Sequence, residues 1–522
     1  MKKEKTSKKI NKKLPEVTLK FLPFRYVLAF IVTVFKVLAI IGAVVWLSIN
    51  VKYFYFIVLI AQFICTLKII ASDTNPDYKV PWLLFVLILP VVGFLLYIIF
   101  SSTTLKRKYV RKFKELKDID YKKDDSVEFL KLKEENVIAY NQAFLIKKIS
   151  NTNLFCDTKT EYFSSGEEYK ESLLEDLKNA KKFIYLEFFI IKKGVFWKEI
   201  YSILKEKAKD GVEVKIVYDD IGCMLTLPSY YYKTLKKDGI KAIPFSRLKG
   251  RLNSEFNNRS HRKIVVIDGF IGYTGGINIG DEYINLKHRY GHWKDCGIKL
   301  TGKAVYEFTK LFLIDYAISS KDFKSGEKIH YPPTLEKIEN GYVMPFGDGP
   351  KPLYTHDVGK SVIQTMLYSA KKYAFITTPY LIIDNDMCQT IEDTALRGVD
   401  VKIIVPKVPD KKIINYLTKS YYERLINAGV KIYEYEKGFI HAKSYLIDDE
   451  YAMLGTINLD YRSLVHHFEN GVWMYNTPCI KDVKEDFIKT LNNSERINDK
   501  KKKQNVFQKL ICALIKVFSP LM

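Results

Sequence analysis

An internal duplication dominates this 522-residue sequence. The stretch at 180–191 has a counterpart at 370–383, and in both copies a run of β-branched and aromatic residues leads into a helical stretch, at 196–209 and 386–397. This alternation predicts βαβ units, and therefore two α/β domains in tandem, each with a mostly parallel sheet. Two equivalent α/β layers generally build one site where they meet, so we expect a single shared site.

Each copy also carries the same polar pattern. A histidine is followed by a lysine two residues on, an aspartate seven on, a glycine fourteen on and an asparagine seventeen on. The first set is His261, Lys263, Asp268, Gly275 and Asn278, and the second is His441, Lys443, Asp448, Gly455 and Asn458. With only eight histidines in the chain, two such matches in register are not accidental.

The residue types of this pattern suit the chemistry of a phosphodiester. Residues i and i+2 of a strand point to one face, so the histidine and lysine of each copy can reach one anion. We expect the lysines and asparagines to neutralise the non-bridging oxygens, one imidazole to attack phosphorus and the other to protonate the leaving oxygen. The aspartates are expected to orient the imidazoles, and the glycines to let the backbone approach the substrate closely.

No metal and no cofactor is predicted, because the side chains themselves supply the positive charge. His288 and His292 are spaced as metal ligands could be, but no carboxylate pattern accompanies them. The seven cysteines are an odd number without a CxxC pair, which argues against a zinc ribbon and against a disulfide framework. They agree with a reducing compartment.

Three apolar blocks occupy the start of the chain. Residues 26–48 and 80–102 are long enough to span a membrane, whereas 53–71 is a short, possible third span. Basic residues flank the blocks, in 1–25 and in 106–117, and the positive-inside rule places both flanks in the cytoplasm. We therefore predict a multi-pass protein of the cell membrane with two crossings and its catalytic body on the cytoplasmic face; three crossings remain open.

Composition and charge complete the domain plan. The predicted parts are a basic cytoplasmic head (1–25), a transmembrane anchor (26–102), a charged, solvated linker (103–135), a first α/β domain (136–325), a second (326–495) and a basic amphipathic tail (496–522). The tail has apolar residues at helical spacing, which suits a helix lying either on a membrane or on the protein's own body. A net charge of +24 favours a polyanionic partner, either nucleic acid or anionic lipid.

The duplicated pattern resembles the HxK(x)4D(x)6G(G/S/T)xN signature of the phospholipase D superfamily. More narrowly, the chain is similar to bacterial cardiolipin synthases of the Gram-positive type, from about residue 60 to the C-terminus. The supporting stretches are 75–82, 256–269, 278–283, 378–380, 460–463 and 468–470. The departures are the long basic head and the additional apolar block, which affect the topology and not the chemistry.

This resemblance implies two tandem phospholipase D-like α/β/α domains behind a membrane anchor. It also implies phosphatidyl transfer between two phosphatidylglycerol molecules, which yields cardiolipin and glycerol through a phosphatidyl-histidine, with His261 as the nucleophile. The expected partners are phosphatidylglycerol and anionic membrane lipid, without nucleic acid, and protein partners stay open. The alternatives are another phosphatidyltransferase or a hydrolytic phospholipase D with the same residues. A nuclease is disfavoured by the apolar blocks, and a non-enzymatic scaffold by the two intact residue sets.

Overall fold

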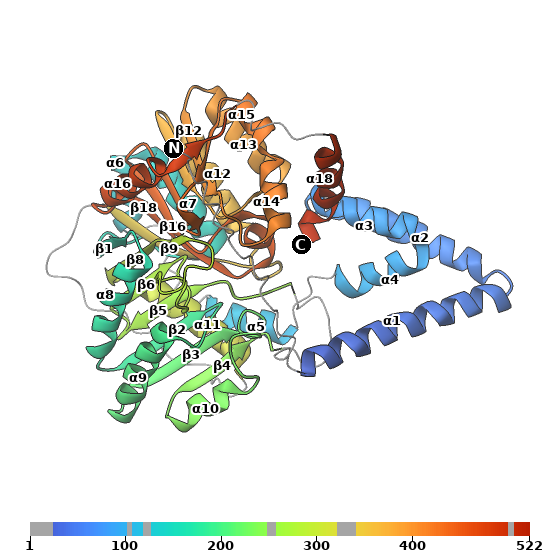
Figure 1. Cartoon of the computed structure of the whole chain (residues 1–522), viewed down its shortest axis with the longest axis horizontal. Helices are drawn as coiled ribbons and strands as arrows, with labels where there is room; N and C mark the ends of the chain where they lie inside the picture. Colours follow the sequence, from blue (N-terminus) through green and yellow to red (C-terminus); the bar gives the residue numbers. More distant parts are fainter. Residues whose placement is uncertain are drawn as a thin grey trace, which may run out of the picture.

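The architecture is a pair of α/β domains that lie against each other, with a group of helices projecting from one side (Figure 1). The computed structural model describes residues 24–101, 107–117, 127–247, 257–320, 341–498 and 506–521. The predicted basic head, 1–25, lies almost wholly outside the described residues.

The first domain is built on a seven-stranded sheet of order β1-β8-β6-β5-β2-β3-β4. Its strands are β1 Thr158–Phe163, β2 Phe183–Phe188, β3 Glu213–Asp219, β4 Lys241–Phe245, β5 Lys263–Ile267, β6 Ile271–Gly275 and β8 Gly297–Gly302. One face is covered by α8 Gly166–Lys178, α9 Val195–Lys209 and α10 Tyr231–Lys237, and the other by α11 Val305–Ser319. The central strands are buried on both faces, which explains their continuous apolar runs.

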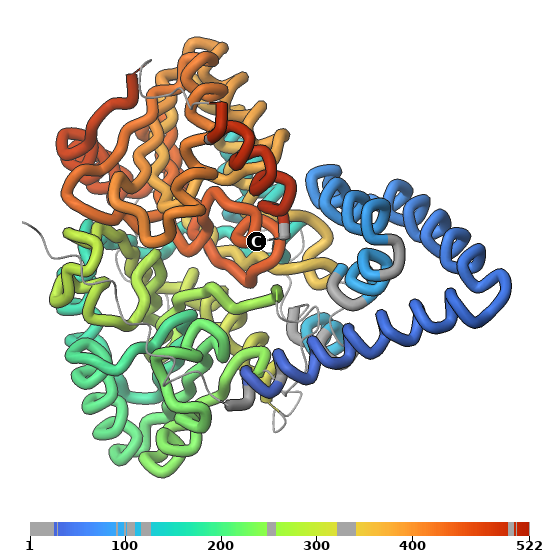
Figure 2. The backbone as a smooth tube through the Cα atoms, turned by 45° about the vertical axis from the view of Figure 1, so that its right-hand side comes forward, coloured from blue at the N-terminus to red at the C-terminus, as the bar shows by residue number. Residues whose placement is uncertain are grey.

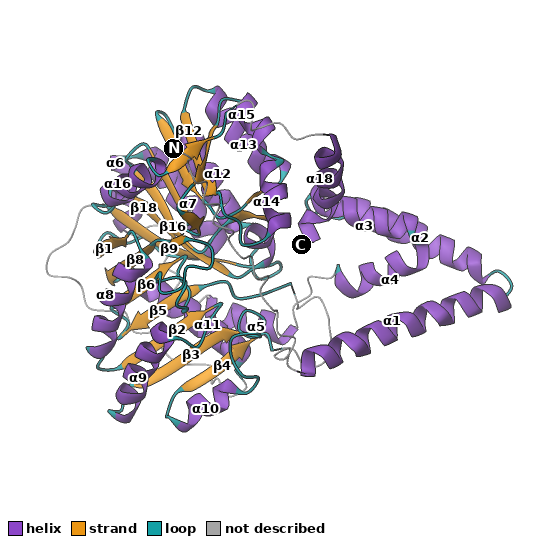
Figure 3. Cartoon of the chain, in the orientation of Figure 1, coloured by secondary structure: helices purple, strands orange, loops and turns teal. Residues whose placement is uncertain are grey.

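The second domain repeats this plan on an eight-stranded sheet of order β19-β13-β12-β10-β15-β16-β18-β9. Its strands are β9 Tyr342–Asp348, β10 Tyr373–Thr377, β12 Asp400–Pro406, β13 Lys431–Tyr435, β15 Ser444–Ile447, β16 Tyr451–Gly455, β18 Glu469–Tyr475 and β19 Ser494–Arg496. Its helices are α12 Val358–Ser369, α13 Asn385–Leu396, α14 Lys412–Lys419, α15 Tyr422–Asn427 and α16 Ile480–Leu491. Figure 3 shows the strands of both domains enclosed by helices.

Both sheets are mixed, so the α/β class is confirmed but the prediction of mostly parallel sheets is wrong. Strands β2, β3 and β4 run parallel, as do β10, β12 and β13, while the other pairs in the two main sheets are antiparallel. The reason is a tight turn after each histidine-bearing segment. Asp268 and Gly269 have positive φ angles, as do Asp448 and Asp449, and such turns fold β5 onto β6 and β15 onto β16 as hairpins.

The charged segment before the first domain is not a solvated linker in its described parts. It forms α5 Arg107–Lys117 and α6 Val127–Glu135, in which Phe113, Phe129 and Leu132 are buried in the main core. The next helix, α7 Val137–Ser150, packs on the second domain, where Gln142 bonds to Ser369 and to Trp473. The predicted start of the first domain at residue 136 is therefore too early, since its first strand begins at Thr158.

The projecting helices form the anchor. Helices α1 Phe24–Asn50 and α2 Phe54–Ala71 make a hairpin whose tip lies farthest from the body (Figure 2), and both are long and apolar enough to cross a membrane. The block at 80–102, predicted as a span, is instead divided between α3 Pro76–Ile88 and α4 Pro90–Phe100. Proline has no backbone N–H and cannot continue a helix without loss, so the apolar block breaks at Pro90. The 53–71 block, which was predicted to be too short for a full crossing, forms the second long helix.

Anchor and body are joined beside the second domain. Asn75 donates to Asp384 (2.7 Å), the Tyr461 hydroxyl donates to Asp77 (2.7 Å), and the Tyr78 ring lies edge-on to Tyr461. The described part of the tail forms α18 Val506–Phe518, which packs on α14 and α3 through one face. The other face leaves apolar side chains exposed, so this helix is amphipathic and contacts the body.

Candidate active site

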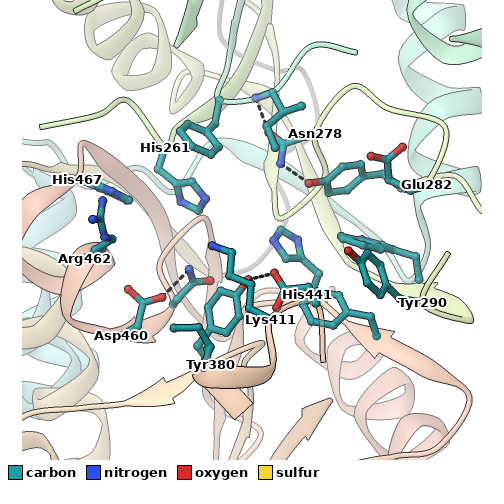
Figure 4. Close-up of a pocket in the computed structure, with 18 of the residues that line it drawn as sticks. His261, Asn278, Glu282, Tyr290, Tyr380, Lys411, His441, Asp460, Arg462 and His467 are labelled. Carbon is teal, nitrogen blue, oxygen red and sulfur yellow. Dashed lines mark hydrogen bonds between the residues drawn. The ribbon is translucent and has the colours of Figure 1, made fainter. Parts of the chain in front are cut away.

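A cavity of about 730 Å³ opens where the two domains meet. Both histidines of the duplicated pattern reach it, His261 from two residues and His441 from three residues before a central strand (Figure 4). Its lining also includes Asn278, Tyr283, Tyr380 and Asn458. The duplication thus forms one shared site, as the sequence predicts.

Each domain holds the histidine of the other. The His261 N–H donates to the carbonyl of Phe468, and Nδ1 lies 2.9 and 3.0 Å from the two carboxylate oxygens of Glu469. The His441 N–H donates to the carbonyl of Lys294, and its Nδ1 lies 2.8 Å from Asp295. A carboxylate on Nδ1 fixes the tautomer and leaves Nε2 as the reactive nitrogen.

The aspartates of the pattern do not perform this role, so that prediction is wrong. Asp268 accepts the backbone N–H groups of Lys181, Lys182 and Phe183 at 2.6–2.9 Å. Asp448 accepts those of the equivalent residues Lys371, Lys372 and Tyr373 at 2.6–2.8 Å. The physical reason is distance along the strand: the histidine precedes β5 or β15 and the aspartate follows it, so the two lie at opposite ends. These aspartates anchor the starts of β2 and β10.

The two lysines lie buried close to the histidines of their own copies. Lys263 Nζ donates to the carbonyl of His261 at 2.6 Å, and Lys443 Nζ donates to that of His441. Burial lowers the pKa of Lys263 to about 7 and that of Lys443 to about 8. Each ammonium has three N–H donors and uses one here. Both lysines are fully buried and do not line the cavity themselves.

The asparagines line the cavity, whereas the glycines do not. Asn278 accepts from the Ile190 N–H and donates to the Tyr283 hydroxyl, at 3.0 and 2.8 Å. Asn458 donates to Asp460, while its buried Oδ1 accepts no hydrogen bond from any described residue. At Gly275 and Gly455 a Cβ atom would lie 2.4 and 2.3 Å from a carbonyl oxygen of the neighbouring strand, so these glycines allow strand packing. Their role in substrate binding stays a prediction.

Burial makes both imidazoles neutral in the free site. It lowers the pKa of His261 to about 3 and that of His441 to about 4, against the opposing pull of their carboxylates. A neutral imidazole with its Nδ1 hydrogen-bonded is nucleophilic at Nε2. Either histidine can therefore attack phosphorus. The negative charge of a bound phosphate would favour protonation of the other histidine.

A metal ion is one further group that these residues could hold. His261, His467 and Glu469 offer ligand atoms within 4.8 Å of one another. The oxygens of Glu469, however, already accept hydrogen bonds from Ser463 and Thr456 as well as facing His261. The metal-free site stays a prediction, tested below.

The sequence pattern did not identify Asp295 or Glu469 as partners of the histidines. They follow His261 and His441 at unequal intervals, so the duplication does not bring them into register. Their shared signal is structural: each comes directly after the residue whose carbonyl accepts the N–H of the opposite histidine. His467, Arg462 and Lys411 also line the cavity and were not predicted.

Comparison with known proteins agrees with this geometry. The family model described as cardiolipin synthase, PLD-like domain, matches residues 173–295 and 363–491, and the phospholipase D-nuclease N-terminal model matches 60–101. A protein of Streptococcus mutans is 40% identical over 87% of this chain and 99% of its own length, and a cardiolipin synthase of Halalkalibacterium halodurans is 34% identical over 82% and 86%. The crystal structure of the phosphatidylserine synthase of Haemophilus influenzae superposes with a TM-score of 0.54 at 17% identity, covering 73% of this chain and 98% of that one, which shows a common fold.

Proposed function

The chain belongs to the cardiolipin synthases of the phospholipase D superfamily, and from this premise we propose that it joins two phosphatidylglycerol molecules into cardiolipin and glycerol. The observation that carries the proposal is the pair of oppositely held imidazoles, His261 and His441, facing one cavity. Two such groups suit a double displacement at phosphorus, which needs a nucleophile and a separate proton carrier.

In the first displacement, His261 Nε2 attacks the phosphorus of one phosphatidylglycerol. The bond from phosphorus to the terminal glycerol oxygen breaks, and His441 gives that oxygen a proton, so that glycerol leaves. Lys263 and Lys443, with Asn278 and Asn458, stabilise the charge on the non-bridging oxygens. The nucleophile is assigned to His261 on the family resemblance.

In the second displacement, the free hydroxyl of another phosphatidylglycerol attacks the same phosphorus. His441 takes the proton of that hydroxyl, the bond from phosphorus to His261 breaks, and cardiolipin results. Both histidines return to their starting state. The reaction is therefore reversible and needs no external reductant, oxidant or nucleotide.

The protein is membrane-associated, and we propose a multi-pass topology for it. Helices α1 and α2 cross as a hairpin, α3 and α4 remain on the side of the body, and the catalytic domains face the cytoplasm. The exposed apolar side chains of α18, Val506 and Phe507 at 86% and 70% exposure among them, lie in the lipid interface. Ser519, just after α18, lines the cavity, so anionic lipid can enter from that interface. No nucleic acid takes part.

The test is to supply the purified full-length protein with vesicles of phosphatidylglycerol alone and to separate the lipids by thin-layer chromatography. Cardiolipin and free glycerol should appear in equal amounts; phosphatidic acid as the main product would indicate a hydrolytic phospholipase D. His261→Ala and His441→Ala should each lose roughly 10³-fold or more of the rate, because the pair acts as a unit. His356→Ala, at an exposed histidine outside the cavity, is the matched control.

Metal dependence is tested on the same preparation. With EDTA the initial rate should be retained once vesicle aggregation is controlled, because protein side chains supply the positive charge. Loss of the rate with restoration by zinc alone would instead implicate His261, His467 and Glu469 as ligands.

A further inference from the structure

Cardiolipin synthesis brings two phosphates into one site, and the residues described so far account for one of them. This inference rests on the proposed function. The reacting phosphate must lie between His261 and His441, where both imidazoles reach it. The acceptor phosphatidylglycerol carries its own phosphate, which lies one glycerol unit away and needs a separate anion site.

Two cationic or protonatable side chains stand apart from the reacting centre. Arg462 and His467 line the cavity together, on the side of His261 that faces away from His441 (Figure 4). The ring of His467 lies 5.5 Å from that of His261, centre to centre. An anion bound by this pair would therefore be a neighbour of the reacting phosphate and not the same group.

Among the described residues, the guanidinium of Arg462 and Nε2 of His467 are without hydrogen-bond partners, whereas Nδ1 of His467 faces Glu469 at 3.8 Å. The nearest carboxylate, Asp460, attracts the guanidinium but already accepts from Asn458 Nδ2 (3.0 Å) and the Ser463 N–H (2.9 Å). A half-buried guanidinium without a hydrogen-bonded counterion suits bidentate binding of phosphate.

The other cations around the cavity are less suited to this task. Arg289 is exposed, and its guanidinium lies over the ring of Tyr290, 5.1 Å from the ring centre. Arg259 is paired with Asp219 through both carboxylate oxygens, and Lys192 is paired with Glu282. Lys287 is paired with Asp281 and half exposed. Lys411 points toward the middle of the cavity, close to the reacting centre (Figure 4).

Arg462 also lies next to the anchor, from which the lipid substrate would enter the cavity. The preceding residue, Tyr461, bonds to Asp77 at the start of α3, and His466 lies edge-on to Tyr78 and 3.4 Å from the carbonyl of Pro520. The turn Arg462–His466 thus lies between the anchor and the reacting centre. We propose that Arg462, assisted by His467, binds the phosphate of the acceptor phosphatidylglycerol and so selects an anionic lipid as the acceptor.

Two reactions of the same phosphatidyl-enzyme distinguish binding of the acceptor phosphate from catalysis at the reacting phosphorus. Cardiolipin synthesis uses an acceptor with a phosphate, whereas exchange of labelled glycerol into phosphatidylglycerol uses an acceptor without one. In exchange, the labelled hydroxyl attacks phosphorus, the bond to His261 breaks and labelled phosphatidylglycerol forms. Both reactions are measured on vesicles of phosphatidylglycerol with purified full-length Arg462→Gln, Arg462→Lys and wild-type protein.

The expected result is a change in the ratio of the two rates. Arg462→Gln should lower the ratio of synthesis to exchange by about 10-fold or more, because a charge-assisted bidentate contact is lost only with the lipid acceptor. Arg462→Lys should give an intermediate ratio, and His467→Ala a smaller decrease. Arg496→Gln, which removes the same charge from an exposed position on β19, should keep the wild-type ratio.

Other outcomes are distinguishable. If Arg462→Gln lowers synthesis and exchange equally, the residue serves the donor phosphate or the fold, and the proposal is wrong. An unchanged ratio at unchanged rates would also overturn it. If the wild-type protein makes no cardiolipin and exchanges no glycerol, the proposed function itself fails.

Discussion

At the scale of single residues, Glu469 and Asp295 should determine the rate of phosphatidyl transfer. Each faces Nδ1 of a histidine from the opposite domain, at 2.8–3.0 Å. Glu469→Gln and Asp295→Asn should lower kcat by ~10²–10⁴, because an amide neither holds the required tautomer nor stabilises an imidazolium. The measurement is kcat per folded molecule, with the folded fraction taken from thermal unfolding. A kcat within about threefold of wild type would contradict the assignment.

Asp268 serves as the comparison for Glu469 and Asp295, because its substitution should affect stability and not kcat. Its oxygens accept three backbone N–H groups at the start of β2, remote from the imidazoles. Asp268→Asn should therefore lower the free energy of unfolding by about 1–3 kcal/mol while kcat per folded molecule changes little. A large loss of kcat in a fully folded variant would restore the role that the sequence suggested for this aspartate.

The buried lysines predict a particular pH dependence. In the free enzyme the pKa of Lys263 is lowered to about 7 and that of Lys443 to about 8, mainly by burial. As pH rises through this window the ammonium charges are lost and phosphate binds less well, so kcat/KM should fall. A bound phosphate raises the lysine pKa, so kcat should fall only at higher pH. Rates between about pH 6 and 10 at constant ionic strength test this; coincident decreases in both parameters would contradict it.

At the scale of helices and strands, single residues determine turns and helix breaks that hydropathy and periodicity do not predict. The His–Lys spacing predicted which side chains share a face, because alternation along a strand is a local property. The hairpin turns at Asp268 and Asp448 escaped prediction, because the repeated pattern suggests instead that these aspartates orient the imidazoles. The break at Pro90 escaped because the surrounding block is uniformly apolar and a window average does not register one missing N–H.

The pairing of α3 with α4 supplies a prediction at this scale. A Cβ atom at Gly93 would lie 1.9 Å from the carbonyl oxygen of Phe85, so the two helices can approach only because residue 93 is glycine. Gly93→Ala should force them apart and disturb the neighbouring contact of Trp82 with Tyr97. We expect a red-shifted Trp82 fluorescence component and a lower unfolding temperature in vesicles. Gly42→Ala on α1 is the control, since nothing lies within 4 Å of its added Cβ; equal effects of both variants would contradict the close contact.

At the scale of the whole molecule, the active site is a product of domain docking. The sequence predicted that two copies share one site; His261 and His441 line it, and both lysines lie buried directly behind them. Asp295 and Glu469 could not be assigned from sequence, because each becomes a partner only when the opposite domain brings its histidine alongside. The packing of α7 on the second domain could not be predicted for the same reason, since the sequence of a helix does not identify the element against which it packs.

The proposed topology places the active site on the cytoplasmic side of the membrane. With α1 and α2 as the crossing pair, the number of crossings is even, although one of the helices differs from the predicted pair. In the proposed topology the hairpin tip is outside, and both the basic segment 106–117 and the catalytic body are inside. Lys52 lies in the tip, between α1 and α2, and Lys502 precedes α18 in the sequence.

Two introduced cysteines test this topology in intact cells. The parent protein carries Cys156→Ser, because the other native cysteines are buried. With a membrane-impermeant maleimide, Lys52→Cys should be labelled in intact cells and Lys502→Cys only after lysis. Labelling of Lys502→Cys in intact cells would place the catalytic body outside. Labelling of neither before lysis would mean that the α1–α2 hairpin enters the bilayer without crossing it, leaving the body cytoplasmic but the anchor monotopic.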